Sequence, residues 1–186
     1  NGFMIGAVVG SVGVVSGVIK PVACFAAGTM IAVPGTSPNT IDYKDIKDIK
    51  VGDFVYAYDE ISGKTEINTV TEVFDRETSV VVEVTINGEV IVTTEEHPFY
   101  TDSGWISASM LQAGDWLRQL DGTYVAVEQV ENRTLPEGTV VYNFEVADNH
   151  TYYVSDESVL VHNKCDSAIK NARKRGVDKA WAKEVE

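Results

Sequence analysis

Cysteine and histidine are scarce in this chain of 186 residues, which holds two cysteines and three histidines. Cys24 and Cys165 are too few for a disulfide framework, and they lack the CxxC spacing of a zinc site. We therefore expect no metal and no cofactor.

Positive charge is also scarce in the middle of the chain. The whole sequence has 15 Lys and Arg residues against 28 Asp and Glu residues, a net charge of −13. Residues 1–23 contribute one basic residue, and residues 164–186 contribute seven basic and four acidic residues. Residues 24–163 therefore hold 7 basic and 24 acidic residues, a net charge of −17. Since phosphate contacts require clustered Lys and Arg, this composition argues against nucleic-acid binding by residues 24–163.

The two ends of the sequence differ in character from the middle. Residues 2–19 carry no charge and place glycines at about four-residue spacing, as in closely packed membrane helices. The same pattern fits a segment packed inside an upstream domain, so membrane contact is one of two alternatives. Residues 166–186 have helical spacing and predict the opening helices of a downstream domain. We treat the sequence as part of a longer polypeptide, with flanks at 1–23 and 164–186 and a central domain at 24–163.

Short β-strands dominate the pattern of the central domain. The dipeptide Asn87-Gly88 separates two runs rich in β-branched residues, which is the strongest short-range signal of a β-hairpin. Helical periodicity is limited to single turns at 46–49 and 108–111. The sequence therefore predicts an all-β fold. The expected strands are 29–33, 54–58, 80–86, 90–93, 116–120, 123–131, 139–146, 151–155 and 158–161.

Two stretches of the central domain repeat each other. Residues 49–59 (IKVGDFVYAYD) match residues 111–121 (LQAGDWLRQLD) in hydrophobic character, with Gly-Asp and the final Asp identical. Two similar halves predict a pseudo-two-fold arrangement. Such a fold brings its ends and its middle to one central cleft. Cleavage of peptide bonds at both ends of the domain would require this geometry.

Cys24 has the chemistry needed to cut the peptide bond that precedes it. Its thiol can attack the Ala23 carbonyl and replace the amide by a thioester. The exchange needs a proton for the departing amine, which the imidazole of His97 can deliver. It also needs the developing negative charge to be held, and we assign this to the Thr94 hydroxyl and nearby backbone N–H groups.

Asn163 has the chemistry needed to cut the bond that follows it. Its side-chain nitrogen can attack its own carbonyl carbon, forming a succinimide and breaking the bond to Lys164. An amide is a poor nucleophile, so positioning must supply much of the acceleration, and ~7–11 kcal/mol is available from this source. His162 and His150 would protonate the leaving amine or polarise the carbonyl.

Four motifs in this order resemble the Hint superfamily, which includes inteins, Hedgehog autoprocessing domains and bacterial intein-like domains. The motifs are CFAAGT at 24–29, TEEH at 94–97, VYNFEVADNHTYYV at 141–154 and VHN at 161–163. The resemblance implies a β-horseshoe with pseudo-two-fold symmetry. The catalytic residues that it implies are Cys24, Thr94, His97, His150, His162 and Asn163.

The sequence is most similar to the intein-like pretoxin Hint domains of bacterial polymorphic toxins, in which a Gly-rich segment precedes the domain and a toxin follows it. This resemblance implies a monomeric, single-turnover domain that acts in cis on its own flanking polypeptides. It also implies a place within a secreted or cell-surface toxin polypeptide of a bacterium.

Two positions depart from the pattern of splicing inteins. Lys164 stands where those proteins have Cys, Ser or Thr as the acyl acceptor, and Asn143 stands where they commonly have an acidic or thiol residue thought to activate that acceptor. Both departures favour cleavage at both ends over ligation. Splicing with Cys165 as acceptor is the first alternative. The second is an inert β-rich spacer in which Cys24 and Cys165 form a disulfide.

Overall fold

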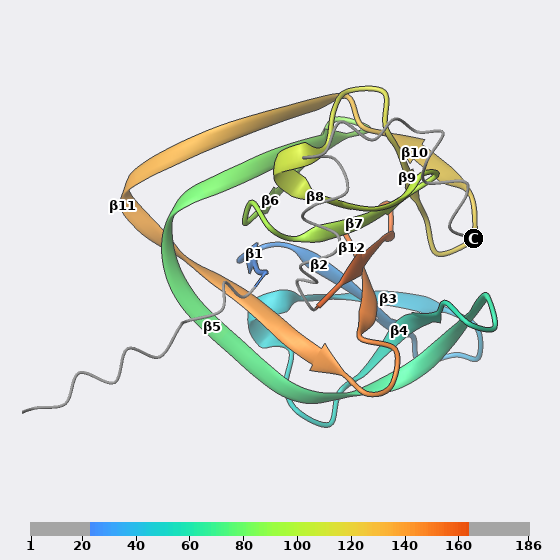
Figure 1. Cartoon of the computed structure of the whole chain (residues 1–186). Coiled ribbons are helices and arrows are strands. Elements are labelled where there is room, and N and C mark those ends of the chain that lie inside the picture. Colours follow the sequence, from blue (N-terminus) through green and yellow to red (C-terminus); the bar gives the residue numbers. More distant parts are fainter. Residues whose placement is uncertain (1–22, 164–186) are drawn as a thin grey trace, which may run out of the picture.

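The computed structural model describes residues 23–163, where strands account for nearly all regular structure (Figure 1). The predicted all-β class is confirmed, and 3-10 turns lie at both places where the sequence shows one helical turn. Membrane contact of residues 2–19 and a helix in 166–186 were predicted for segments outside the described residues. The elements are β1 (Phe25–Ala26), β2 (Met30–Pro34), β3 (Ile41–Asp45), η1 (Ile46–Asp48), β4 (Phe54–Asp59), β5 (Lys64–Ile86), β6 (Glu89–Thr93), β7 (Pro98–Thr101), β8 (Gly104–Ser107), η2 (Ala108–Met110), β9 (Trp116–Arg118), β10 (Tyr124–Ala126), β11 (Gln129–Val146), β12 (Thr151–Val154) and β13 (Val159–His162).

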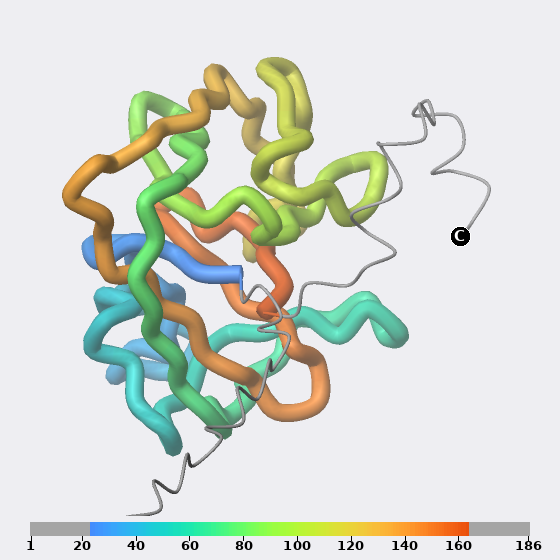
Figure 2. The backbone as a smooth tube through the Cα atoms, turned by 60° about the vertical axis from the view of Figure 1, so that its left-hand side comes forward, coloured from blue at the N-terminus to red at the C-terminus, as the bar shows by residue number. Residues whose placement is uncertain are grey.

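The strands form two sheets. One has the order β11-β1-β6-β5-β4, with β5 also paired to β11, and the other has the order β10-β9-β7-β13-β12-β2-β3, with β8 added at β7. The long antiparallel pair of β5 and β11 curves around one side of the molecule, and the shorter strands lie inside the curve (Figure 1 and Figure 2). This is the curled, horseshoe-like sheet that the resemblance implies.

The β5–β11 ribbon is where the strand boundaries expected from the sequence are wrong. β5 begins at Lys64 rather than at residue 80, and β11 runs unbroken from Gln129 to Val146 rather than in two pieces. Most side chains in the first part of β5 are exposed, so no apolar alternation marks it as a strand. The short strands β1, β3, β7 and β8 were also not predicted.

The Asn87-Gly88 hairpin is confirmed. Ile86 of β5 pairs with Glu89 of β6, so the connection consists of two residues. The φ angles of Asn87 and Gly88 are 44° and 77°, both in the left-handed region. A two-residue type I′ turn requires positive φ at both positions, which is why this dipeptide is such a strong signal.

The repeat is also confirmed, and it extends to individual hydrogen bonds. The N–H of Gly52 donates to the Val70 carbonyl at 2.9 Å, and the N–H of Gly114 donates to the Val127 carbonyl at 2.8 Å. The two glycines have φ angles of 92° and 89°. Each repeat also follows a 3-10 turn and leads into a strand. The two halves are therefore related by the predicted pseudo-two-fold symmetry.

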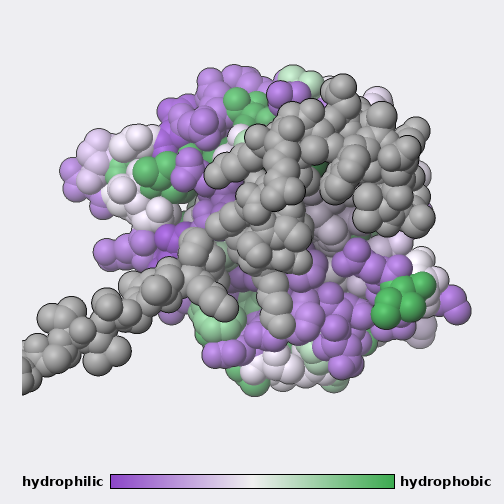
Figure 3. Space-filling view, in the orientation of Figure 1, coloured by the Kyte–Doolittle hydropathy of each residue, from purple (hydrophilic) through white to green (hydrophobic). Residues whose placement is uncertain are grey.

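The core lies between the two sheets and contains side chains from both. Its largest members, which have no exposed surface or almost none, include Phe25, Phe99, Leu117, Phe144 and Tyr152. The face seen in Figure 3 is mainly hydrophilic, with small separate hydrophobic spots. No helix within residues 23–163 has the length and apolar character that a membrane span requires.

Candidate active site

The backbone of Cys24 is fixed by the strand that follows it and by the end of β6. Phe25 pairs with Tyr142 of β11 and with Thr93 of β6. The Cys24 carbonyl accepts hydrogen bonds from the Thr94 N–H at 2.9 Å and from the Thr93 hydroxyl at 3.0 Å. The Cys24 N–H, which belongs to the 23–24 peptide bond, donates to the Thr94 hydroxyl oxygen at 3.0 Å. The 23–24 peptide bond is therefore held at its nitrogen end.

The contact made by Thr94 differs from the expected one. We expected its hydroxyl at the Ala23 carbonyl, but it accepts a hydrogen bond from the nitrogen of Cys24. The cause is the position of Thr94 directly after β6. Its own N–H donates to the Cys24 carbonyl, and this bond places the Thr94 hydroxyl beside the N–H of Cys24. Thr94 therefore orients the nitrogen of the 23–24 peptide bond.

The Cys24 thiol lies in a buried environment that opposes its ionisation. Burial raises the pKa of the thiol to about 11, because the thiolate would lose its hydration. The Arg76 guanidinium acts in the opposite direction, by its charge and by a hydrogen bond to the thiol. Arg76 is held in turn by Glu96, with 3.0 Å between Arg76 Nη2 and Glu96 Oε1.

Arg76 is a site residue that the sequence reasoning missed. It is one of only seven basic residues in the central domain, and Glu96 belongs to the TEEH motif. These two facts could have drawn attention to it. Its position on β5 opposite Val141 of β11, however, depends on a strand segment that the sequence does not reveal.

His97 is completely buried beside the 23–24 bond. Its ring packs against Phe25 with 4.0 Å between the ring centroids. The pKa of His97 lies well below its ordinary value, because burial disfavours the imidazolium and the nearby His162 adds repulsion. Among residues 23–163 neither ring nitrogen has a hydrogen-bond partner of good geometry, although the Ala23 carbonyl lies close enough to favour the protonated ring. At neutral pH the imidazole is therefore uncharged.

Asn163 lies at the other end of the same cluster. It is 7% exposed, and its N–H donates to the His150 carbonyl at 2.8 Å. Within the described part of the chain, neither atom of its side-chain amide has a hydrogen-bond partner. An unpaired buried polar group costs ~1–3 kcal/mol, and such groups require an explanation. Here the explanation can be chemical, since the nitrogen is left available to react.

The Asn163 carbonyl accepts a hydrogen bond from Asn143. The side-chain nitrogen of Asn143 lies 3.1 Å from the carbonyl oxygen, and this contact is buried. The side-chain oxygen of Asn143 accepts from the Phe144 N–H and from the Tyr152 hydroxyl, both at 2.8 Å. The predicted auxiliary residue thus contacts the carbonyl of the 163–164 peptide bond. Lys164 and Cys165, the other two auxiliary residues, lie outside the described residues.

The remaining two histidines lie together beside Asn163. Their ring centroids are 6.3 Å apart, and the ring of His162 packs edge-on against Trp105 at 5.2 Å. His150 Nδ1 lies 3.4 Å from Glu145 Oε1, which is an ion-pair distance when the imidazole is protonated. These contacts orient both rings at the end of β13.

Cys24 and Asn163 lie at one shared buried centre. His162, next to Asn163, acts electrostatically on His97, next to Cys24. Tyr152 also connects them: its hydroxyl donates to Asn143, and its pKa lies well above the ordinary value because of burial and of the nearby Cys24. The structure brings together all six residues predicted as catalytic, namely Cys24, Thr94, His97, His150, His162 and Asn163.

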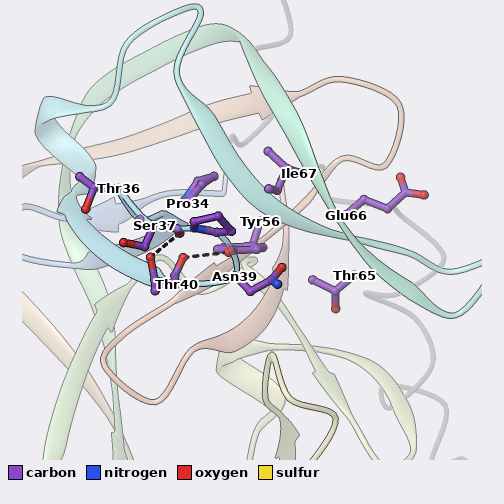
Figure 4. A pocket seen from close by; sticks show the side chains of 11 residues that line it. Pro34, Thr36, Ser37, Asn39, Thr40, Tyr56, Thr65, Glu66 and Ile67 are labelled. Atoms are coloured by element: carbon purple, nitrogen blue, oxygen red, sulfur yellow. Dashed lines mark hydrogen bonds between the residues drawn. The ribbon is translucent and has the colours of Figure 1, made fainter.

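Other features within the described residues do not compete with this centre. Between Ala23 and Asn163 no group of three His, Cys, Asp or Glu side chains is arranged to hold a metal ion. A pocket of about 480 Å³ lies at the β2–β3 turn, where the Tyr56 hydroxyl donates to the Thr40 carbonyl at 3.0 Å (Figure 4). None of the six predicted catalytic residues lines it.

The β-horseshoe has an internal repeat, a buried cysteine directly before its first strand and a His-Asn pair at the end of its last strand. This combination defines a Hint-type, intein-like domain. The chain belongs to the pretoxin HINT domain family, whose model matches residues 39–164. The family and the fold support autocatalytic self-cleavage or splicing in general.

Solved structures agree with this assignment. A bacterial intein-like domain from Clostridium thermocellum is similar with 42% identity and a TM-score of 0.69, over 75% of this chain and 98% of that one. A DnaB intein from Synechocystis sp. PCC 6803 shares the fold, with 19% identity and a TM-score of 0.63 over 76% of this chain and 99% of that one. The comparison with curated proteins finds no match.

Proposed function

We propose that residues 24–163 cut their own polypeptide at the 23–24 and 163–164 bonds, and that the second cut releases the downstream segment. The observation that carries this proposal is the arrangement at Asn163. Its buried side-chain amide has no hydrogen-bond partner within residues 23–163, while its carbonyl is held by Asn143. Burial of Ala23 and Cys24 in the same centre supports a reaction in cis, because the chain's own ends fill the site.

At the upstream bond, the Cys24 sulfur attacks the Ala23 carbonyl carbon. A carbon–sulfur bond forms, the carbon–nitrogen bond breaks, and the thiol proton ends on the new Cys24 amine. Neutral His97 can accept the thiol proton and return it to that nitrogen. Its depressed pKa makes the transient imidazolium a strong acid, which suits protonation of the leaving amine. Water then hydrolyses the thioester and restores the thiol.

At the downstream bond, the side-chain nitrogen of Asn163 attacks its own main-chain carbonyl carbon. The bond to the nitrogen of Lys164 breaks, and the proton lost by the amide passes to that nitrogen. The products are a terminal succinimide and a new amino terminus at Lys164. The adjacent imidazoles of His162 and His150, which Trp105 and Glu145 orient, can carry the proton.

The biological setting follows from the family. A pretoxin HINT domain indicates a bacterial toxin polypeptide. In our proposal the cut at 163–164 frees its toxin-like segment. We propose the limits 1–23, 24–163 and 164–186 for upstream flank, processing domain and released segment. Secretion or display at the cell surface would follow from that role.

Two substitutions in the 186-residue chain test the proposal on reducing and non-reducing gels. Asn163→Ala should abolish the cut at 163–164, and Cys24→Ala should abolish only the cut at 23–24. A joined product of residues 1–23 and 164–186 would instead indicate splicing through Cys165. An uncut chain that migrates faster without reductant would indicate an inert spacer closed by a disulfide.

A further inference from the structure

We propose that Asn143 is a catalytic residue of the 163–164 cleavage, where it donates the hydrogen bond that stabilises negative charge on the Asn163 carbonyl oxygen. This inference rests on the proposed cyclisation of Asn163. The contact is direct, with 3.1 Å between Asn143 Nδ2 and the carbonyl oxygen. Asn143 is 3% exposed, so water does not screen the interaction strongly.

The orientation of the Asn143 amide is determined by its neighbours. The backbone N–H of Phe144 can only donate, so the atom of Asn143 that lies 2.8 Å from it must be oxygen. The Asn163 carbonyl can only accept, so the atom facing it must be nitrogen. Tyr152 then donates its hydroxyl to the same Asn143 oxygen at 2.8 Å. Tyr152 is therefore a positioning residue that holds the donor toward the reacting carbonyl.

This arrangement suits the chemistry of the step. When the Asn163 nitrogen attacks, the carbonyl oxygen gains negative charge, and a donor already in place stabilises that charge without reorganisation. A carboxylate at position 143 would instead place a negative charge against this oxygen. The presence of an amide, where splicing inteins commonly carry an acidic or thiol group, thus favours cleavage at 163–164 without activation of an acyl acceptor.

Substitutions at position 143 in the full chain test this role. Asn143→Ala should slow the 163–164 cut by ~10²- to 10³-fold, the effect of losing one oxyanion donor. The 23–24 cut induced by added thiol serves as an internal readout of folding and should change by less than ~3-fold. Tyr152→Phe should slow the 163–164 cut by ~3- to 10-fold, since the Phe144 N–H still orients the amide. Asn132→Ala, an exposed asparagine on the same strand, is the matched control.

Asn143→Asp decides the question if the alanine variant fails to fold. At pH 7.5 the ionised carboxylate should suppress the 163–164 cut, and at low pH the protonated carboxyl can donate, so the rate relative to the unaltered chain should recover. Cleavage by this variant at the unaltered rate at pH 7.5 would overturn the role of Asn143. Asn163→Ala separates the two proposals. If this variant still cuts at 163–164, the cyclisation itself is wrong. If Asn163→Ala is inactive but Asn143→Ala cuts at the unaltered rate, only the role of Asn143 is rejected.

Discussion

Replacement of Arg76 by methionine tests the electrostatic part of the site. Methionine keeps an extended apolar side chain but removes the charge and the hydrogen bond that favour the Cys24 thiolate. A hydrogen bond to a charged group contributes ~1.5–3 kcal/mol, and one pH unit corresponds to ~1.4 kcal/mol. The pKa of Cys24, already about 11, should therefore rise further by ~1 to 2 pH units. The negative charge of Glu96, which loses its ion pair with Arg76, would raise the pKa of Cys24 further.

The assay is thiol-induced cleavage at 23–24 in an Asn163→Ala background, which isolates the upstream reaction. At pH 8 the Arg76→Met rate should fall by ~10- to 100-fold, in proportion to the thiolate fraction. Arg76→Lys keeps the charge and should recover part of the rate. Arg133→Met is the matched control, since Arg133 forms an ion pair with Glu83 at 2.9 Å on a more exposed part of the ribbon. Equal rates for the two methionine variants would refute the role assigned to Arg76.

Three further predictions concern the reacting residues. Cys24→Ala and His97→Ala should each block the 23–24 cut and leave the rate of the 163–164 cut within ~3-fold of that of the unaltered chain, because succinimide formation uses neither side chain. A fragment ending at Ala23 from the Cys24 variant, seen by mass spectrometry, would contradict thioester formation. Lys164→Cys should shift products toward a joined 1–23/164–186 species on gels, since a thiol can accept the acyl group and a lysine ammonium with pKa ~10.4 cannot; unchanged products would count against Lys164 as the block to splicing. The free energy of unfolding should fall as pH is lowered through ~6.5, because the unfolded chain protonates His97 there and the folded chain, with its depressed pKa, does not. Urea unfolding at pH 7.5 and 5 should show a smaller fall in this free energy for His97→Gln than for the unaltered chain. An equal fall would show that another group titrates.

The sequence identifies those parts of the fold that depend on local signals. Asn87-Gly88 requires a turn with positive φ at both positions, and the two Gly-Asp repeats form the same hydrogen bonds in both halves. The first part of β5 gives no such signal, because its exposed residues, from Lys64 onward, have no apolar period. Its strand conformation comes from pairing with the preceding strand β4 and then with β11, which is distant in the sequence.

The same distinction holds for the site. The thiol, the imidazoles and Asn163 are recognisable because of their residue types and their places in four motifs. The contacts that surround them come from strand pairing: Arg76 reaches Cys24 from β5, and Asn143 reaches the Asn163 carbonyl from β11. The contact of Thr94 with nitrogen rather than with the Ala23 oxygen likewise depends on how β6 ends. Residue type indicates the reaction, and the register of the paired strands determines which atom each side chain contacts.

Intact-mass measurement of the full chain during incubation, without added thiol, tests the central claim most directly. The account predicts a downstream fragment that begins at Lys164 and an upstream fragment that ends at Asn163 and is one water molecule lighter than a hydrolytic product, because a succinimide forms without water. Both fragments should be absent from Asn163→Ala. An upstream fragment that carries a free carboxylate from its first appearance, or a joined product of residues 1–23 and 164–186 from the unaltered chain, would contradict the account.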